Sequence, residues 1–201
     1  MSRPDYTEQI KNRIDNADSG SIFLASDFAD IADNKTVHMS LTRLTEQEKL
    51  QKILRGVYMK PRYSSLLDEY IPPRPNDIAR AIARNFGWKI CPSDLAALNL
   101  TGLSTQVPAT WEYISNGPYK TYIFDNCKIV FRHTDRNTDL TNVSSKTALI
   151  IRALKALGKE NINESTYQLL SGKLTSEEKE KLLEESQHCT SWIYKAIKQI
   201  C

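Results

Sequence analysis

The chain has 201 residues, 40% of them hydrophobic and 25% charged, with a formal net charge of +3. This length allows two small domains or one larger one, and the composition is ordinary for a folded soluble protein. The net charge is too small for indiscriminate coating of nucleic acid. Because no apolar run approaches the length of a membrane span and the first residues lack an apolar signal core, we expect a cytoplasmic protein that does not enter a membrane.

The first thirty residues predict two helices separated by a short strand. An apolar spacing of four marks the first helix: Tyr6, Ile10 and Ile14. Residues 18–20, Asp-Ser-Gly, are expected to end it, and the apolar run 22–24 indicates a short strand. Ser26 or Asp27 is a candidate N-cap for a second helix carrying Phe28.

The most informative segment is residues 35–60, where a third helix is followed directly by a β-hairpin. Val37, Leu41 and Leu44 form one apolar stripe, and the polar residues beside them are free to donate hydrogen bonds. Two β-like runs, 50–54 and 57–58, are interrupted by the turn pair Arg55-Gly56. A helix that ends in a two-stranded wing is the winged helix-turn-helix pattern, in which the helix enters the major groove and the wing follows the backbone.

This interpretation predicts the residues that contact DNA. They lie off the apolar stripe of the third helix or flank the turn of the hairpin: Lys35, Thr36, His38, Ser40, Thr42, Arg43, Lys52 and Arg55. The distribution of charge supports this set of DNA-contacting residues. Residues 1–34 carry three basic and seven acidic side chains, a net of −4, whereas residues 35–62 carry seven basic and two acidic ones, a net of +5. Positive charge therefore gathers where phosphates should lie, although charge runs on a helix are more often an ordinary solvated surface.

The expected fold class is α+β. We expect a winged helix-turn-helix domain at 1–62, a Pro-rich connector at 63–76 and a C-terminal α+β domain at 77–201. In the C-terminal domain, alternating runs near 111–114, 119–124 and 128–133 predict an antiparallel three-stranded meander. Helical periodicity from Val143 onward predicts a helical end, including a tail over 161–201.

The order of several short elements resembles the AbiEi family of type IV, or abortive-infection, antitoxins. The elements are Arg43-Leu44, Arg55-Gly56-Val57-Tyr58, Leu98-Asn99-Leu100-Thr101, Thr105-Gln106-Val107-Pro108, Asn116-Gly117-Pro118, Ile129 to His133, and Arg136-Asn137. The resemblance covers roughly residues 5 to 157. It implies an antitoxin that represses its own operon at inverted repeats, whose symmetry is compatible with a homodimer on DNA. It also implies that the C-terminal domain counteracts a nucleotidyltransferase-like toxin, with or without direct contact.

Enzymatic chemistry is not expected. Asp125, Asp135, Asp139 and Lys128 have the composition of a nuclease-like set, but the aspartates lie in predicted turns and loops. Arg132, His133 and Arg136 are either a second basic patch or a solvated strand end. The four cysteines and three histidines are scattered without metal-ligand spacing, so we expect reduced thiols, no metal and no cofactor.

Two other functions remain open from sequence. The chain is alternatively a winged-helix transcriptional regulator with a C-terminal sensor or dimerisation domain and no toxin. The third class is a protein-interaction module whose winged helix binds protein instead of DNA. A steep loss of affinity with salt is expected for DNA binding only.

Overall fold

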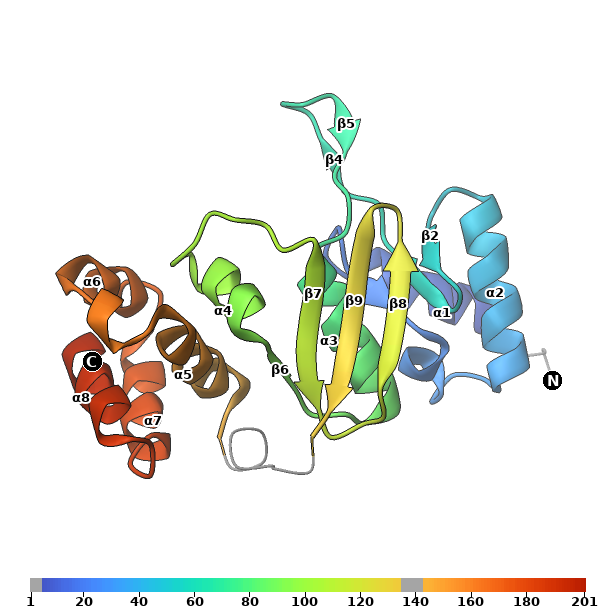
Figure 1. Cartoon of the computed structure of the whole chain (residues 1–201). Helices are drawn as coiled ribbons and strands as arrows, with labels where there is room; N and C mark the ends of the chain where they lie inside the picture. The colour runs from blue at the N-terminus through green and yellow to red at the C-terminus, as the bar shows by residue number, and fades with distance from the viewer. Residues whose placement is uncertain (1–4, 135–142) are drawn as a thin grey trace. The chain divides into compact units, whose positions relative to one another are not determined.

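The computed structural model describes residues 5–134 and 143–201 and has the expected α+β class (Figure 1). Its contacts divide the chain into two compact units. Unit 1 comprises the residues up to Gly87 together with Ile123–Asp125, and unit 2 comprises Trp88–Tyr122 and Asn126–Cys201. The expected domain limits at residues 62 and 76 stay predictions, while the contacts place the division after Gly87.

Unit 1 contains a helix, a strand, a short 3-10 helix, a second helix and a hairpin, in that order. These are α1 (Tyr6–Asp15), β1 (Ile22–Phe23), η1 (Ala25–Phe28), α2 (Asn34–Glu46), β2 (Gln51–Leu54) and β3 (Val57–Met59). The three strands form an antiparallel sheet in the order β1-β3-β2. The hairpin and the helix before it therefore lie where the apolar periodicity predicts them.

The predicted second helix is wrong in kind, because the chain makes only the 3-10 helix η1 there. Hydrogen bonds cap the start of η1 and occupy one of its backbone carbonyls. Asp27 accepts a hydrogen bond from the backbone N–H of Leu24 (2.9 Å), which caps the start of η1. Arg13 donates to the backbone carbonyl of Asp27 (2.8 Å) and to both carboxylate oxygens of Asp30 (2.7 and 2.6 Å). The carbonyl of Asp27 is therefore bonded to Arg13, where a longer helix would use it for its next turn.

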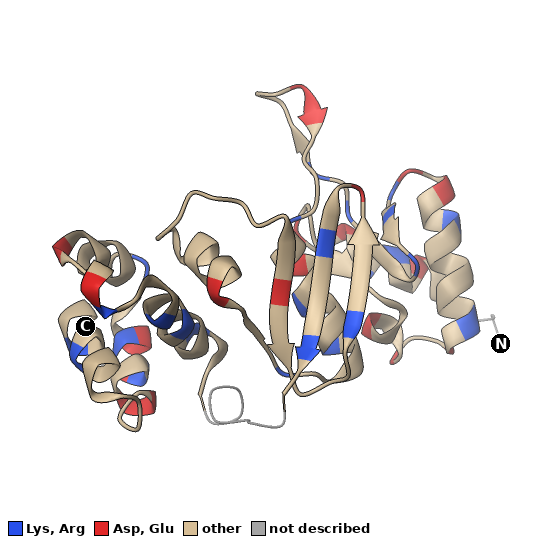
Figure 2. Ribbon diagram, viewed as in Figure 1, with Lys and Arg blue, Asp and Glu red and all other residues tan. Residues whose placement is uncertain are grey.

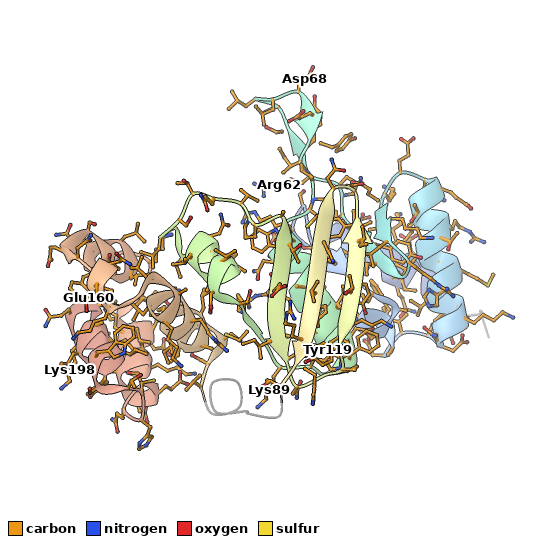
Figure 3. All side chains as sticks on the ribbon, viewed as in Figure 1. Arg62, Asp68, Lys89, Tyr119, Glu160 and Lys198 are labelled. Atoms are coloured by element: carbon orange, nitrogen blue, oxygen red, sulfur yellow. The ribbon has the colours of Figure 1, made fainter. Side chains whose placement is uncertain are left out.

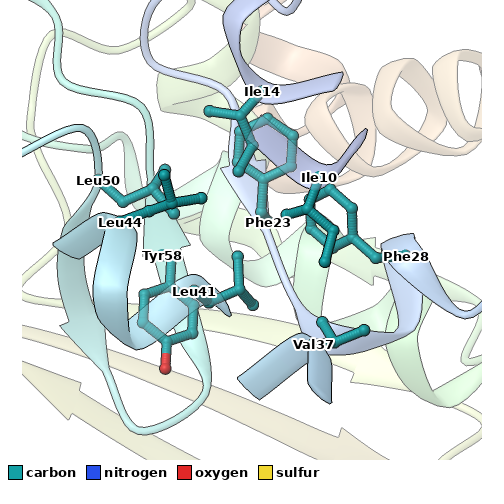
Figure 4. Close-up of a cluster of buried hydrophobic side chains, with 9 residues drawn as sticks. All are labelled: Ile10, Ile14, Phe23, Phe28, Val37, Leu41, Leu44, Leu50 and Tyr58. Carbon is teal, nitrogen blue, oxygen red and sulfur yellow. The ribbon is translucent and has the colours of Figure 1, made fainter. Parts of the chain in front are cut away.

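One apolar cluster joins these elements (Figure 4). It takes residues from α1, β1, η1, α2 and the hairpin: Ile10, Ile14, Phe23, Phe28, Val37, Leu41, Leu44, Leu50 and Tyr58. The stripe Val37, Leu41 and Leu44 is fully buried against this cluster. The orientation of α2 about its own axis is thus fixed by burial.

The predicted Pro-rich connector contains structure of its own. β4 (Tyr63–Ser64) and β5 (Glu69–Tyr70) form an antiparallel pair with Asp68 at its turn (Figure 3), and α3 runs over Pro75–Phe86. Arg84 of α3 donates to both carboxylate oxygens of Asp27 (3.0 and 2.8 Å). Helix α3 therefore helps to hold η1, and its contacts group it with unit 1.

Unit 2 combines a four-stranded sheet with five α-helices and one 3-10 helix in its described residues. The elements are β6 (Ile90–Pro92), α4 (Asp94–Thr101), β7 (Thr110–Ser115), β8 (Lys120–Phe124), β9 (Cys127–His133), α5 (Ser145–Leu157), η3 (Lys159–Asn161), α6 (Glu164–Ser171), α7 (Ser176–Glu185) and α8 (Ser191–Ile200). The sheet order is β6-β7-β9-β8.

The predicted meander is wrong, because β9 lies between β7 and β8 and pairs with β7 in parallel. Alternation of apolar and polar residues predicts that a segment is a strand, but it does not say which strand lies beside it. The two-residue turn Asp125-Asn126, with Asp125 at φ +45°, sends the chain from β8 back into the middle of the sheet.

The predicted helical tail packs against α5 through a second apolar cluster. Leu154 of α5, Leu170 of α6, Leu182 of α7 and Ile197 of α8 are all buried in it. In the part of the chain that the structure describes, no helix has the length and apolar character needed to cross a membrane.

The first prediction tests the core beneath α2. Phe28 is 0% exposed, so Phe28→Ala should lower the free energy of unfolding by about 3–5 kcal/mol. Leu66, at 92% exposed, is the control, and Leu66→Ala should change the free energy by no more than about 0.5 kcal/mol. Urea unfolding of both variants measures the difference; equal midpoints would show that this cluster does not support the fold.

Candidate nucleic-acid interface

Asp33 begins α2 by capping its N-terminus. Its carboxylate accepts hydrogen bonds from the backbone N–H of Thr36 (2.9 Å) and from the Thr36 hydroxyl (3.1 Å). These two bonds hold the pKa of Asp33 below its ordinary value. The Thr36 hydroxyl, one of the predicted DNA contacts, is therefore already engaged in the cap, although the residue stays partly exposed.

The predicted contacts Lys35, His38, Thr42 and Arg43 are all exposed on one face of α2. With 3.6 residues per turn, their positions fall on the side of the helix away from Val37, Leu41 and Leu44. Met39 lies among them and is 60% exposed. Sequence reasoning missed Met39 because it selected hydrogen-bond donors, whereas helical spacing from Lys35 and Arg43 would have found it.

Ser40 must be removed from the predicted contacts. It is 3% exposed, and its hydroxyl is hydrogen-bonded to that of Thr7 in α1 (3.1 Å). The reason is geometric, since Ser40 lies three residues after Val37 and four before Leu44, inside the stripe that faces α1. Ser40 thus positions α2 on α1 and does not reach the solvent face.

The β2–β3 hairpin presents the remaining two predicted contacts, Lys52 and Arg55, both exposed. Lys52 is paired in register with Tyr58, and the ladder is irregular between Lys52 and Leu54. Gly56 adopts φ +79°, a left-handed conformation that L side chains rarely tolerate, and so permits the tight turn after Arg55. The hairpin is antiparallel, with Lys52 within β2 and Arg55 at the turn.

Basic residues lie along α2 and the hairpin, as the blue segments of Figure 2 show. One of the seven basic residues of 35–62 serves a different purpose. The Lys60 ammonium donates to the backbone carbonyls of Asp15 and Ala17, both at 2.8 Å, at the end of α1. The candidate interface therefore consists of the outward face of α2 and the β2–β3 hairpin: Lys35, Thr36, His38, Met39, Thr42, Arg43, Lys52 and Arg55.

Two members of the carboxylate–lysine set considered from sequence, Asp125 and Lys128, lie in the described residues. Asp125 occupies the turn between β8 and β9, and Lys128 is exposed on β9. Asp135 and Asp139 lie outside the described residues. Across the described ranges, 5–134 and 143–201, no three His, Cys, Asp or Glu side chains gather in an arrangement that could hold a metal ion.

Two residues of the second basic patch considered from sequence, Arg132 and His133, make hydrogen bonds within unit 2. Arg132 donates to both carboxylate oxygens of Glu112 (3.0 and 2.7 Å), and these bonds lower the pKa of Glu112. His133 is hydrogen-bonded through Nδ1 to the backbone carbonyl of Gly117 (2.9 Å). Arg136 lies outside the described residues. These contacts favour a structural role for Arg132 and His133.

The Asn116-Gly117-Pro118 element also has a structural role. Asn116 accepts a hydrogen bond from the backbone N–H of Lys89 (2.8 Å) through its side-chain oxygen. A Cβ atom at Gly117 would lie only 2.5 Å from the indole ring of Trp88, so this glycine allows the close approach. Trp88 in turn packs edge-on against Phe131, with ring centroids 5.4 Å apart.

Comparisons with known proteins give one family. A family model matches residues 9–182, and its description is a family of unknown function (DUF6088). The match includes α2, the β2–β3 hairpin and most of unit 2. No curated protein matches the chain.

The second prediction concerns Gly117. Because an added methyl group would collide with Trp88, Gly117→Ala should destabilise unit 2 by about 1–3 kcal/mol. The same substitution should cost less in a Trp88→Leu background, since the ring that it meets is gone. Thermal unfolding of the four proteins in this cycle measures the coupling; a cost that is identical in both backgrounds would rule out the steric explanation.

Proposed function

We propose that this chain, which belongs to a family of unknown function (DUF6088), binds double-stranded DNA through α2 and the β2–β3 hairpin. The observation that carries the proposal is the single exposed face of α2. It presents Lys35, His38, Thr42 and Arg43 beside a hairpin that exposes Lys52 and Arg55. Seven basic residues against two acidic ones in 35–62 make this the basic part of unit 1.

The order of elements supports a winged helix-turn-helix. A helix, a strand, a short helical turn and a second helix precede the hairpin, and β1 completes its sheet beside β3. In this proposal α2 is the recognition helix, the β2–β3 hairpin is the wing, and η1 takes the place of the middle helix. An α-helix fits the major groove, while a wing reaches the adjacent backbone.

The exposed side chains divide by chemistry. Lys35, Lys52 and Arg55 are suited to phosphate oxygens, which set affinity without reading sequence. Arg43 has the bidentate donor geometry that reads the O6 and N7 atoms of guanine, and the Thr42 hydroxyl is suited to either base edge. In this proposal the wing positions the protein on the DNA backbone, and α2 reads the base sequence.

The biological role that we propose is that of an antitoxin and autorepressor in the cytoplasm. It rests on the resemblance to AbiEi antitoxins, whose elements occur in both units. Unit 1 would bind inverted repeats in the operator of its own operon, with a homodimer matching their symmetry. Unit 2 would counteract a nucleotidyltransferase-like toxin, whether or not the two proteins touch.

A second candidate, a transcriptional regulator with a sensor domain, is favoured by one pocket in unit 2. This pocket has a volume of about 930 Å³ and is lined from α5, α7 and the segment after α7 by residues that include Lys155, Glu180, Lys181, Glu184 and His188. Volumes of this order accommodate small molecules. A reading frame for a nucleotidyltransferase-like protein directly downstream of the gene would favour the antitoxin; its absence would favour the regulator.

The experiment that tests DNA binding titrates the full chain against duplexes that tile the DNA upstream of its own gene. Affinity for one duplex that falls steeply as salt rises supports the proposal. Binding that is insensitive to salt, or absent for every duplex, contradicts it. For the antitoxin role, expression of the chain should restore growth to cells that express the downstream gene.

The third prediction concerns base reading by α2. Arg43→Ala should weaken operator binding by about 1–3 kcal/mol and relax the preference for one base pair, because a bidentate contact to guanine is lost. Arg80→Ala, which removes an exposed arginine of α3, is the matched control and should bind as the parent does. Fluorescence anisotropy measures both affinities. Parental affinity in Arg43→Ala, with an unchanged melting temperature, would remove Arg43 from the interface.

The fourth prediction concerns the wing. Lys52→Ala and Arg55→Ala should weaken binding to all duplexes alike and reduce the slope of log affinity against log salt by about one unit each. Both side chains are exposed, so the fold should be unaffected. Titrations at several salt concentrations give the slopes. A loss confined to one base pair of the operator would instead mean that the hairpin reads sequence.

A further inference from the structure

Met39 is the one apolar side chain on the outward face of α2, and it lies at the middle of that face. It is 60% exposed and follows Lys35 by four residues and precedes Arg43 by four. The buried stripe of α2 is complete without it, since Val37, Leu41 and Leu44 fill the contact with the core. Core packing therefore does not account for a methionine at this position.

We propose that Met39 contacts the C5-methyl group of a thymine in the major groove and makes the protein select thymine at that position. This inference rests on the proposed DNA binding. The C5-methyl of thymine is the apolar group on the major-groove edges of the base pairs, and the other outward residues of α2 all carry polar groups. Methionine is flexible and polarisable, so its side chain adapts to a small apolar target.

The spacing of Met39 and Arg43 along α2 also predicts how far apart their two target base pairs lie. Four residues of α-helix advance about 6 Å along the axis. Successive base pairs of one strand lie about 3.4 Å apart. A helix along the groove runs obliquely to the duplex axis, so Met39 and Arg43 face base pairs about one to two steps apart. The preferred half-site should therefore contain a thymine and a guanine at this separation.

The experiment first selects preferred duplexes from a random library with the full chain. Each thymine of the best duplex is then replaced in turn by deoxyuridine, which removes the methyl group and leaves all hydrogen-bonding groups in place. One replacement per half-site should weaken binding by the parent protein about fourfold, because the burial of one methyl group is lost. The thymine so identified should lie about one or two base pairs from a guanine whose replacement weakens the parent but not Arg43→Ala.

Met39→Ala should bind the selected duplex more weakly than the parent and should no longer distinguish thymine from deoxyuridine at that position. The matched control is Leu67→Ala, which shortens an apolar side chain of similar exposure, 59%, between β4 and β5. This control should keep the fourfold difference. Met39→Leu should keep most of it, because leucine also offers an apolar surface.

The outcomes separate the two claims. If the parent selects a sequence but Met39→Ala responds to every deoxyuridine as the parent does, the assignment of Met39 is overturned and DNA binding stands. If no duplex is enriched by the parent, the proposed function fails and the assignment of Met39 fails with it.

Discussion

The burial of one face of α2 is the constraint on which the rest of unit 1 depends. Val37, Leu41 and Leu44 enter the apolar core with α1 and η1, and the hydroxyl of Ser40 bonds to Thr7 on the same side. This packing leaves a single way to turn the helix about its axis. On α2, the side chains of Lys35, His38, Met39, Thr42 and Arg43 are exposed because this inner face is closed.

The neighbours of α2 reinforce the same orientation. Arg13 on α1 and Arg84 on α3 both bind Asp27, the first through the backbone carbonyl and the second through the carboxylate. The 3-10 helix η1 is thereby held from two sides, and Phe28 is directed into the core beneath α2. Isolated exposed ion pairs contribute little to stability, but paired guanidinium groups on one short segment fix its geometry.

Sequence periodicity predicted α1, α2 and the β2–β3 hairpin because each of them buries a regular apolar pattern. It failed at η1, where the apolar residues are right but Arg13 bonds the backbone carbonyl of Asp27 that a longer helix would use. It also chose Ser40 as a contact, although spacing alone places this residue beside Leu41 and Leu44. A donor on the edge of an apolar stripe is easily misassigned, because sequence does not show how wide the buried stripe is.

Sequence periodicity could not predict how elements far apart in the chain are arranged. The strands of unit 2 were recognised individually, yet β9 lies between β7 and β8, an order that depends on how the chain crosses over. Sequence also did not reveal the extent of unit 1. The prolines before α3 indicate a connector, whereas Arg84, eleven residues after Pro73, binds Asp27. In the candidate interface, sequence identified the charged residues and overlooked Met39, whose role depends on its exposure.

The central claim is that α2 and the β2–β3 hairpin form the surface that binds DNA. A titration of isotopically labelled protein with its operator duplex, followed by backbone amide NMR, locates this surface directly. We predict that the shifted amides will concentrate in residues 34–46 and 51–59, with little change elsewhere in unit 1. Shifts that leave α2 and the β2–β3 hairpin unchanged and appear on other elements would contradict the central claim.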